Sequence, residues 1–392
     1  MPRKVKVVHL ITKLEFGGAQ QNTLYTASHL DPDRYDVTVV AGEGGLLDEQ
    51  ARRLAEDPRR PFRLRFAPSL VREVHPLKDA TALFELWRIL REEGAELVHT
   101  HSSKAGILGR LAAWLAGVPV VVHTFHGFGF NDRQRPLVKA AYVALERLCA
   151  RVSTRLVFVS EANRAQAEAL GIAAAGRSEL IRSGVRLLDY PARVDDPAKK
   201  KASLGLRMHK PLVVSVGNLK PQKNPESFLR VAERVLSNVP ESSWYFVGDG
   251  PLRPAVGGRV VAKGLTNKVF FPGWRRDTAE ILASADVFVL TSLWEGLPRA
   301  LVEAMKTGLA CVCYATDGVR DVIEEGENGF LIEPGDEAAM AAKVEALLKD
   351  PAGAKAVGAR AAKSIGRDFD IDEMVRRQEK LYSALLHGRN RS

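Results

Sequence analysis

The stretch TSLWEGLPRALVEAM, residues 291–305, decides how the chain is organised. Pro298 has a fixed φ and no N–H to lose, so it suits the first turn of a helix and disrupts a helix interior. We therefore expect a helix that begins at Leu297 or Pro298, after an apolar strand at 286–290 and a short loop. Apolar residues recur along it at the 3.6-residue period of a face that packs on a core: Leu297, Leu301, Ala304 and Met305.

Two glutamates flank the start of this helix. Glu295 precedes it, beside Gly296, and Glu303 lies on the face away from the core. The first-turn N–H groups and the helix dipole favour an anion such as phosphate, which leaves the two carboxylates to bind neutral hydroxyls. A sugar joined to a nucleoside diphosphate offers hydroxyls at both ends and phosphates in the middle. The alternative is a surface ion pair between Arg299 and Glu303, worth about 0.3 kcal/mol, with Glu295 solvated.

These residues also carry a resemblance. Two glutamates with seven residues between them, and Gly-Leu-Pro at 296–298, resemble the signature of the retaining, nucleotide-sugar-dependent glycosyltransferases of family four. The resemblance implies the GT-B fold, an α/β architecture in which two Rossmann-like, doubly wound parallel-sheet domains face each other across a cleft. It also implies that Glu303 binds the donor ribose, that Glu295 acts at the transferred sugar as a catalytic residue, and that Gly296 and Leu297 line the donor site.

Length and composition agree with a folded protein of two domains, because the chain has 392 residues, 46% of them hydrophobic and 27% charged. Three cysteines without metal-ligand spacing are typical of a reducing compartment, so we expect a cytoplasmic location. The apolar run 5–11 contains His9, which indicates a strand and not a signal peptide. No run approaches the roughly eighteen apolar residues that a membrane span needs.

The net charge of +10 has several explanations: nucleic acid, an anionic membrane surface, an anionic substrate, or a generic solvated surface. The basic residues are scattered and are not interleaved with aromatic residues, so we expect no nucleic-acid partner. A peripheral contact with an anionic membrane, at its inner face, stays open.

The first half of the chain alternates strands and helices. Gly17 and Gly18 follow the strand at 5–11 and open a helix that runs to about residue 30. Glycine lets a backbone approach a ligand closely, although an ordinary turn is the alternative, and in the resembled family this loop lines the cleft. The later alternation favours a parallel doubly wound sheet, whose ligands bind at the carboxyl ends of its strands. The expected strands are 36–40, 62–66, 96–100 and 119–123, and the expected helices include 77–92 and 104–116.

Four histidines gather where two of these strands end, His99 and His101 in one place and His123 and His126 in the other. A metal site is conceivable, but no cysteine or carboxylate completes a ligand set, so we expect no metal and assign the first three to hydrogen bonds within the core. His126 differs because it precedes an aromatic-glycine turn. The resemblance places a His-Gly there and implies that His126 is catalytic, contacting the transferred sugar or assisting the departing phosphate. The alternative is a plain loop residue.

The second half repeats the same alternation after a Pro-, Asp- and Lys-rich stretch at 191–210, which we interpret as a linker. It begins with a strand at 212–216, a loop at 217–224 and a helix to about residue 236. The predicted domains are 1–190 and 211–368, with a C-terminal helix at 369–392. The resemblance implies that the first is the acceptor-side domain, that the second binds the donor nucleotide, and that the C-terminal helix crosses back to the first domain. A helix near 253–265 is expected to be broken by Pro254 and the glycines at 257–258.

The family resemblance assigns further donor contacts and also finds departures. The family holds the diphosphate with an Arg and a Lys; Lys223 matches the Lys, but Asn218 stands in place of the Arg, so one charge-assisted contact is missing. Trp274 and Arg275 lie in a stretch that resembles the loop receiving the nucleobase, largely through backbone groups. Where the family has Gly-Gly, this chain has Asp317-Gly318, whose charge is unwelcome near phosphates.

We therefore expect a retaining glycosyltransferase that moves a sugar from a nucleoside-diphosphate sugar, of the UDP or GDP type, to a hydroxyl of a glycan or lipid-linked acceptor in polysaccharide or glycolipid biosynthesis. It needs no cofactor and no metal, because a lysine and helix-terminal N–H groups can neutralise the diphosphate. Two alternatives remain: a sugar-nucleotide 2-epimerase of the same fold, and an inactive binding subunit, the latter suggested by Asn218 and Asp317.

Overall fold

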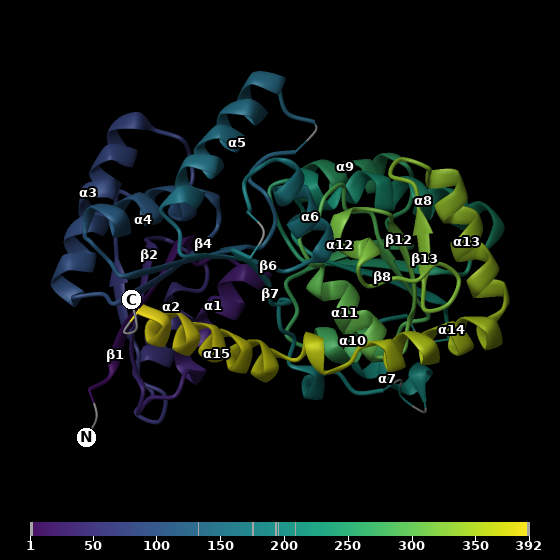
Figure 1. The fold of residues 1–392 in the computed structure, drawn as a ribbon. Helices are drawn as coiled ribbons and strands as arrows, with labels where there is room; N and C mark the ends of the chain where they lie inside the picture. Colours follow the sequence, from purple (N-terminus) through teal and green to yellow (C-terminus); the bar gives the residue numbers. More distant parts are fainter. Residues whose placement is uncertain are drawn as a thin grey trace. The chain divides into compact units, whose positions relative to one another are not determined.

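The computed structural model describes residues 3–131, 133–174, 176–192, 194, 196–207 and 209–389. It contains two compact units, one formed by Met1–Gly184 with Ile371–Ser392 and the other by Val185–Asp370. Each unit is built on one parallel sheet with helices on its faces, labelled in Figure 1. The expected fold class, two doubly wound parallel-sheet domains, is confirmed.

The first unit contains a seven-stranded sheet in the order β3-β2-β1-β4-β5-β6-β7. Its strands are β1 (Val5–Lys13), β2 (Tyr35–Gly42), β3 (Arg63–Phe66), β4 (Leu97–His101), β5 (Val120–Phe125), β6 (Arg155–Phe158) and β7 (Ser178–Leu180). Its helices are α1 (Gly18–His29), α2 (Asp48–Ala55), α3 (Pro76–Glu93), α4 (Ser103–Leu115), α5 (Pro136–Arg151), α6 (Glu161–Ala169) and α15 (Ile371–Arg389).

Alternate residues of the central strands enter two separate cores, because successive side chains of a strand point to opposite faces. Val7 and Ile11 of β1 pack with α1, α2 and α15, whereas Val8 and Leu10 pack with α3 and α4. Covering both faces explains why these strands are almost continuously apolar.

The C-terminal helix α15 is part of the first unit (Figure 1). The Tyr25 hydroxyl donates to Asp372 at 2.6 Å, and the backbone N–H of Asp31 donates to Glu379 at 2.7 Å. Tyr382 of α15 is fully buried in the core beneath these contacts. The helix is therefore fixed to α1 and the sheet by both polar and apolar contacts.

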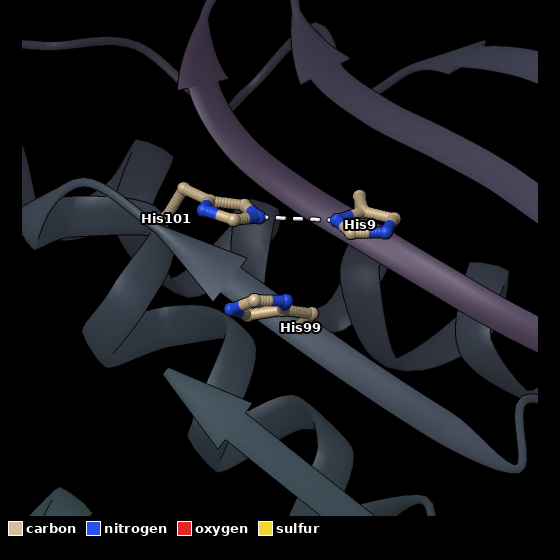
Figure 2. A group of neighbouring side chains, drawn as sticks. All are labelled: His9, His99 and His101. Atoms are coloured by element: carbon tan, nitrogen blue, oxygen red, sulfur yellow. Dashed lines mark hydrogen bonds between the residues drawn. The ribbon is translucent and has the colours of Figure 1, made fainter. Parts of the chain in front are cut away.

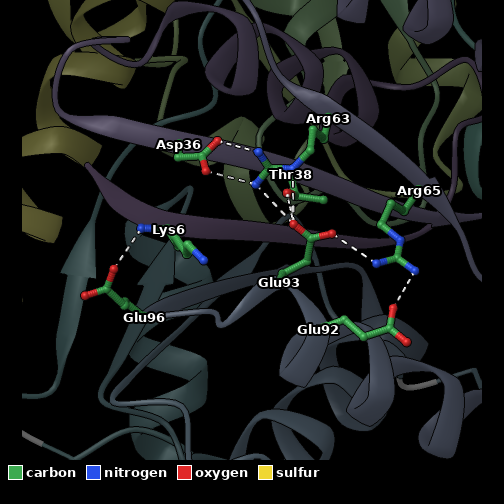
Figure 3. Close-up of polar contacts among 8 residues, drawn as sticks. All are labelled: Lys6, Asp36, Thr38, Arg63, Arg65, Glu92, Glu93 and Glu96. Atoms are coloured by element: carbon green, nitrogen blue, oxygen red, sulfur yellow. Dashed lines mark hydrogen bonds and ion pairs between the residues drawn. The ribbon is translucent and has the colours of Figure 1, made fainter. Parts of the chain in front are cut away.

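A network of charged side chains fixes the edge strand β3 (Figure 3). Arg63 binds Asp36 at 2.7 Å and Glu93 at 3.0 Å, and Arg65 binds the same Glu93 at 3.0 Å. Thr38 also donates to Glu93 at 3.0 Å. Glu93, the last residue of α3, thus ties that helix to β2 and β3 at the edge of the sheet.

The second unit contains a six-stranded sheet in the order β10-β9-β8-β11-β12-β13. Its strands are β8 (Leu212–Val216), β9 (Ser243–Val247), β10 (Val269–Gly273), β11 (Val287–Leu290), β12 (Ala310–Tyr314) and β13 (Phe330–Ile332). Its α-helices are α7 (Pro197–Ser203), α8 (Pro225–Asn238), α9 (Arg253–Ala262), α10 (Thr278–Ser284), α11 (Arg299–Lys306), α12 (Asp317–Arg320), α13 (Glu337–Lys349) and α14 (Pro351–Ser364). Short 3-10 turns are η1 (Leu187–Asp189), η2 (Pro221–Lys223) and η3 (Arg367–Phe369).

The stretch expected to be a linker, 191–210, lies inside the second unit, because the division falls between Gly184 and Val185. Part of it forms α7, which Asp196 caps by accepting from the N–H of Lys199. Lys201 is buried and binds Asp286 at 2.8 Å. Pairing with a partner distant in sequence therefore orders a segment whose local composition is that of a loop.

The helix expected to be broken near 253–265 is continuous as α9, so that prediction was wrong. Pro254 lies in the first turn, where no N–H is needed. Gly257 and Gly258 face open space, so they weaken the helix without interrupting it. Within the residues described, no helix combines the length and the apolar character needed to cross a membrane.

Candidate functional site

The site in the second unit lies where the strand order reverses. β8 leads to β9 on one side and β11 leads to β12 on the other, so the loops that follow β8 and β11 diverge at their carboxyl ends. In doubly wound sheets this switch point is where ligands bind. The first loop carries Lys223 and the second carries Glu295, and the fold therefore brings together two residues distant in sequence.

Lys223 Nζ forms an ion pair with Glu295 Oε1. The side chains are only 17% and 7% exposed, so neither charge is compensated by bulk water. The stem of Lys223 also packs beside Gly217, where an added Cβ would lie 3.2 Å from Lys223 Cε. The structure thus brings these two residues together, while their roles in binding stay predictions.

Several hydrogen bonds join the loop after β8 to the loop after β11. Thr291 donates to the backbone carbonyls of Lys223 and its neighbour Asn224, both at 3.0 Å. Gln222 donates through its side chain to the carbonyl of Trp294 at 2.9 Å. These contacts lie on either side of the ion pair, and they fix the positions of both charged side chains.

Glu303 belongs to the same region and is also buried, at 8% exposure. It forms an ion pair with Arg299 at 3.7 Å and accepts a hydrogen bond from Tyr190. Burial raises the pKa of Glu303, and the charges of Arg299 and Lys223 oppose that rise. Burial likewise raises the pKa of Tyr190, which keeps its hydroxyl protonated as a donor.

The alternative, a solvent-exposed ion pair between Arg299 and Glu303 with Glu295 solvated, is correct about the pair but wrong about its exposure. The ion pair between Arg299 and Glu303 exists, but their side chains are only 15% and 11% exposed, and Glu295 is buried as well. Two buried carboxylates and a partly buried guanidinium form the kind of charged cluster that functional sites often contain, and the binding of a ligand here stays a prediction.

Close approaches of backbone shape the loops of this site. A Cβ on Gly318 would lie 1.7 Å from the carbonyl oxygen of Gly296, and a Cβ on Gly248 would lie 1.9 Å from that of Gly217. Only glycine fits such contacts. Gly318 therefore supports the segment that carries Glu295, and Asp317 begins α12 directly beside it. Leu297 of the same segment is buried.

The remaining donor-site candidates of this unit lie in two further loops. Asn218 follows Gly217 in the loop after β8. Trp274 follows β10, is 40% exposed, and lies 3.4 Å from the position of a Cβ on Gly248. Arg275 instead binds Asp277 through two nitrogens, at 2.8 and 2.6 Å, and the carbonyl of Leu204 at 3.0 Å. A contribution of Arg275 to nucleobase binding through its backbone stays a prediction.

The glycine loop of the first unit begins α1 as expected. Gly17 is the N-cap residue, with extended backbone, and Gly18 is the first helical residue. An added Cβ on Gly17 would meet only the flexible side chain of Gln20. The packing of this unit does not itself demand glycine at position 17, which leaves close approach of a ligand as an explanation.

His126 follows β5 and is partly buried. Its Nε2 lies 3.1 Å from Nδ1 of His101, whose Nε2 lies 3.1 Å from Nδ1 of His9. His123 points to the other face of the sheet, where it binds the hydroxyl of Thr100 at 2.8 Å. His101 and His123 are thus hydrogen-bonded as expected, while the catalytic role of His126 stays a prediction.

One nitrogen each of His9, His99 and His101 lies within 4.8 Å of the other two, a group that could hold a metal ion (Figure 2). However, His99 uses both ring nitrogens, at 2.5 Å to the Tyr382 hydroxyl and at 2.7 Å to that of Thr124. Coordination would break one of these bonds inside a dry core, which is unfavourable.

The sequence analysis did not identify two residues that contact candidate site residues, Tyr190 and His9. Tyr190 lies in the segment assigned to the end of the first domain, and no local pattern indicates that it approaches Glu303. His9 was recognised only as a polar residue inside an apolar run. Its position in the parallel pairing, opposite His99, could have been anticipated from the strand alignment.

Comparisons with known proteins match both halves of the chain. Residues 17–184 match the family model of the glycosyl transferase 4-like domain, and residues 196–364 match that of the glycosyl transferases group 1. The UDP-Gal:alpha-D-GlcNAc-diphosphoundecaprenol alpha-1,3-galactosyltransferase of Escherichia coli is 35% identical over 336 residues, which cover 85% of this chain and 85% of that protein.

Solved structures show the same fold. HepE of Anabaena, in complex with UDP and glucose, has a TM-score of 0.81 at 21% identity and covers 97% of this chain and 100% of its own. The sucrose-phosphate synthase of Thermosynechococcus elongatus has a TM-score of 0.81 at 19% identity, and the match covers 98% of this chain and 100% of that protein's chain.

Proposed function

Because the chain belongs to the group 1 glycosyltransferases, which have the GT-B fold, we propose that it transfers a sugar from a UDP-sugar to a hydroxyl of a lipid-diphosphate-linked sugar. The observation that carries this proposal is the pair of buried carboxylates, Glu295 and Glu303, with the mostly buried Lys223 bound to Glu295 at the switch point of the second sheet. The relative from Escherichia coli supports the choice of donor and acceptor, since its name specifies a UDP-sugar and a diphosphoundecaprenol-linked sugar.

Each residue of the group has a role that fits its chemistry. Lys223 and the N–H groups at the start of α11 take the diphosphate charge, so no metal is needed. Glu303 accepts hydrogen bonds from the ribose hydroxyls. Glu295 is released from Lys223 when the phosphates bind, and it then accepts hydrogen bonds from the transferred sugar. Trp274 and the backbone of Arg275 border the nucleobase.

We further propose that transfer retains the anomeric configuration and that His126 contacts the transferred sugar. Both proposals rest on the family resemblance. A retaining enzyme of this kind breaks the bond between sugar and phosphate as the acceptor oxygen forms its bond on the same face, and the acceptor proton passes to the departing phosphate. NMR of the first product formed tests retention, because an inverted anomer would contradict it.

An assay with defined substrates tests the proposed function. The native enzyme is incubated with UDP-galactose and a short-chain polyprenyl diphosphate that carries N-acetylglucosamine. Formation of a disaccharide-lipid supports the proposal, and GDP-galactose is the matched donor control. If UDP-galactose alone yields free epimerised sugar, the epimerase is the correct reading. If no donor of a UDP-, GDP- and ADP-sugar panel turns over, the chain is a binding subunit.

A lipid-linked acceptor lies in a membrane, so the enzyme must reach the membrane surface. We propose that α5 makes a peripheral contact with this surface. This helix buries one face and exposes apolar side chains on the other, with Leu137 85%, Leu145 41% and Leu148 46% exposed. These residues follow the helical period, and Arg135 and Arg151 lie at its two ends. An exposed apolar stripe flanked by cations fits the interface of an anionic bilayer. The free, buried cysteines agree with a location on the cytoplasmic side.

Sedimentation with vesicles of anionic phospholipid tests this contact. Binding should weaken as salt rises, because exposed charges are screened beyond about 8–10 Å at physiological ionic strength. Leu145→Glu should abolish binding, whereas the matched variant Val261→Glu, on exposed α9, should not. Equal binding by both variants would contradict α5 as the contact.

A further inference from the structure

A cationic side chain lies at the positive end of helix α11. Arg299 is the first residue of this helix, directly after the N-cap residue Pro298. Pro298 caps no N–H group through its side chain, and the first turn contains no acidic residue. The positive end of a helix is an unfavourable place for a positive charge. Positive charge is therefore concentrated at the start of α11 and is not compensated within the first turn.

The guanidinium of Arg299 is also largely shielded from solvent. Its side chain is 15% exposed, and Nη2 lies 3.7 Å from Oε1 of Glu303, one turn further along the helix. This distance exceeds that of a hydrogen bond. A basic residue four positions before an acidic one is also the less favourable order for an ion pair on a helix. The contact with Glu303 alone is thus a weak reason for a shielded cation at this position.

Arg299 lies in the same charged neighbourhood as Lys223. Burial raises the pKa of the Glu303 carboxylate, and the charges of both Arg299 and Lys223 oppose this rise. The diphosphate of the proposed donor carries more than one negative charge, yet Lys223 is the one cationic side chain assigned to it above. Asn218, in the same loop as Lys223, is neutral. A second cation close to Lys223 would therefore complete the diphosphate site.

We propose that Arg299 is this second cation and binds the diphosphate of the donor beside Lys223. A guanidinium has five N–H donors in a planar fork, so it can bind two phosphate oxygens and still attract Glu303. The N–H groups of the first turn of α11 favour an anion at the same position. A bound phosphate would also offset the repulsion between Arg299 and the helix dipole.

This placement agrees with the role proposed for Glu303. Arg299 and Glu303 are four residues apart, which is about 6 Å along the helix axis. The diphosphate would lie at the helix start and the ribose one turn further along, in the order in which a nucleoside diphosphate joins them. The inference rests on the proposed function in this respect, because it takes α11 as the helix that binds the donor.

The competing explanation is that Arg299 only holds Glu303 in place. The two explanations differ in the part of the ligand that they affect. Lost support of Glu303 acts on the ribose, which uridine and UDP both contain, whereas a lost phosphate contact acts on UDP alone. The dissociation constant of uridine divided by that of UDP therefore isolates the contribution of the diphosphate.

Calorimetry with UDP, together with displacement of UDP by uridine, measures this ratio in the native chain and in Arg299→Met. We expect Arg299→Met to weaken UDP binding about tenfold or more, as for lost charge-assisted hydrogen bonds, and to lower the ratio by the same factor. Arg299→Lys keeps the charge but not the planar fork, so its ratio should lie between the two. Circular dichroism verifies that each variant is folded.

Two further variants serve as controls. Arg230→Met removes an arginine of α8 that also pairs with a glutamate four positions away, Glu226 at 3.8 Å, and it should leave the ratio unchanged. Lys223→Met should lower the ratio, because the proposed function assigns the diphosphate to Lys223.

The outcomes separate this inference from the proposed function. An unchanged ratio in Arg299→Met beside a lowered ratio in Lys223→Met would overturn the inference and leave the proposed function intact. Equal weakening of uridine and UDP in Arg299→Met would also overturn it, because Arg299 would then act through Glu303. An unchanged ratio in both variants would contradict the inference and the proposed position of the diphosphate together.

Discussion

Lys223 and Glu295 form a buried ion pair across the switch point of the second sheet, although the loops that carry them follow different strands. The two residues that the family resemblance assigns to different ligand groups, Lys223 to the phosphates and Glu295 to the sugar, thus neutralise each other in the structure. A donor brings its own anion to Lys223 and its own hydroxyls to Glu295. Exchange of partners lets the site bind a charged ligand without leaving a buried charge uncompensated.

Removing either Lys223 or Glu295 alone should lower the free energy of unfolding more than removing both charges. Lys223→Met leaves the buried Glu295 carboxylate without its cation, which should lower the free energy of unfolding by about 3 kcal/mol. The double variant Lys223→Met/Glu295→Gln should recover most of that loss. Urea denaturation of the four proteins measures the coupling, and additive losses would contradict the buried pair.

Tyr190 should stabilise the protein through Glu303. Tyr190→Phe removes a hydroxyl that donates to a buried carboxylate, and hydrogen bonds to charged groups are worth about 1.5–3 kcal/mol. The loss should shrink in a Glu303→Gln background, where the acceptor is neutral. Thermal and urea unfolding measure both backgrounds; an equal loss in each would show that Tyr190 acts through its ring packing alone.

Alanine should be harmful at position 318 and harmless at position 257. A Cβ at position 318 would overlap the carbonyl of Gly296, so Gly318→Ala should displace the segment that carries Glu295 and lower both stability and kcat. Gly257→Ala is the control, because position 257 is helical and open and alanine there should stabilise α9 by about 0.5–1 kcal/mol. A neutral Gly318→Ala would contradict the close approach.

The sequence predicted those features of the fold and of the candidate site that a local pattern or a motif determines. The alternation of apolar strands and helices predicts both sheets, and the proline at position 298 places the start of α11 to within a residue. Glu295 and Glu303 were predicted together because the signature fixes their spacing, whereas Lys223 was predicted from its match to a separate loop of the family.

Other features depend on contacts between distant segments, which no local pattern records. Glu303 lies on the face of α11 away from the core, yet the segment containing Tyr190 reaches it, so it is buried. Lys201 orders α7 by pairing with Asp286, which turned an expected linker into part of the second unit. His9 acquires its partner only through the register of β1 against β4.

The binding of bare UDP to Glu295→Gln and Glu303→Gln, measured by calorimetry beside the native protein, tests the assignment of the two glutamates most directly. UDP contains the ribose and the phosphates but no transferred sugar. Glu303→Gln should therefore weaken UDP binding about tenfold or more, as expected for lost charge-assisted hydrogen bonds, and raise KM while sparing kcat. Glu295→Gln should bind UDP at least as tightly as the native protein and instead lower kcat, because its contact strengthens as the sugar gains positive charge. If both variants bind UDP and turn over like the native enzyme, the two glutamates are structural and the proposed donor site is wrong.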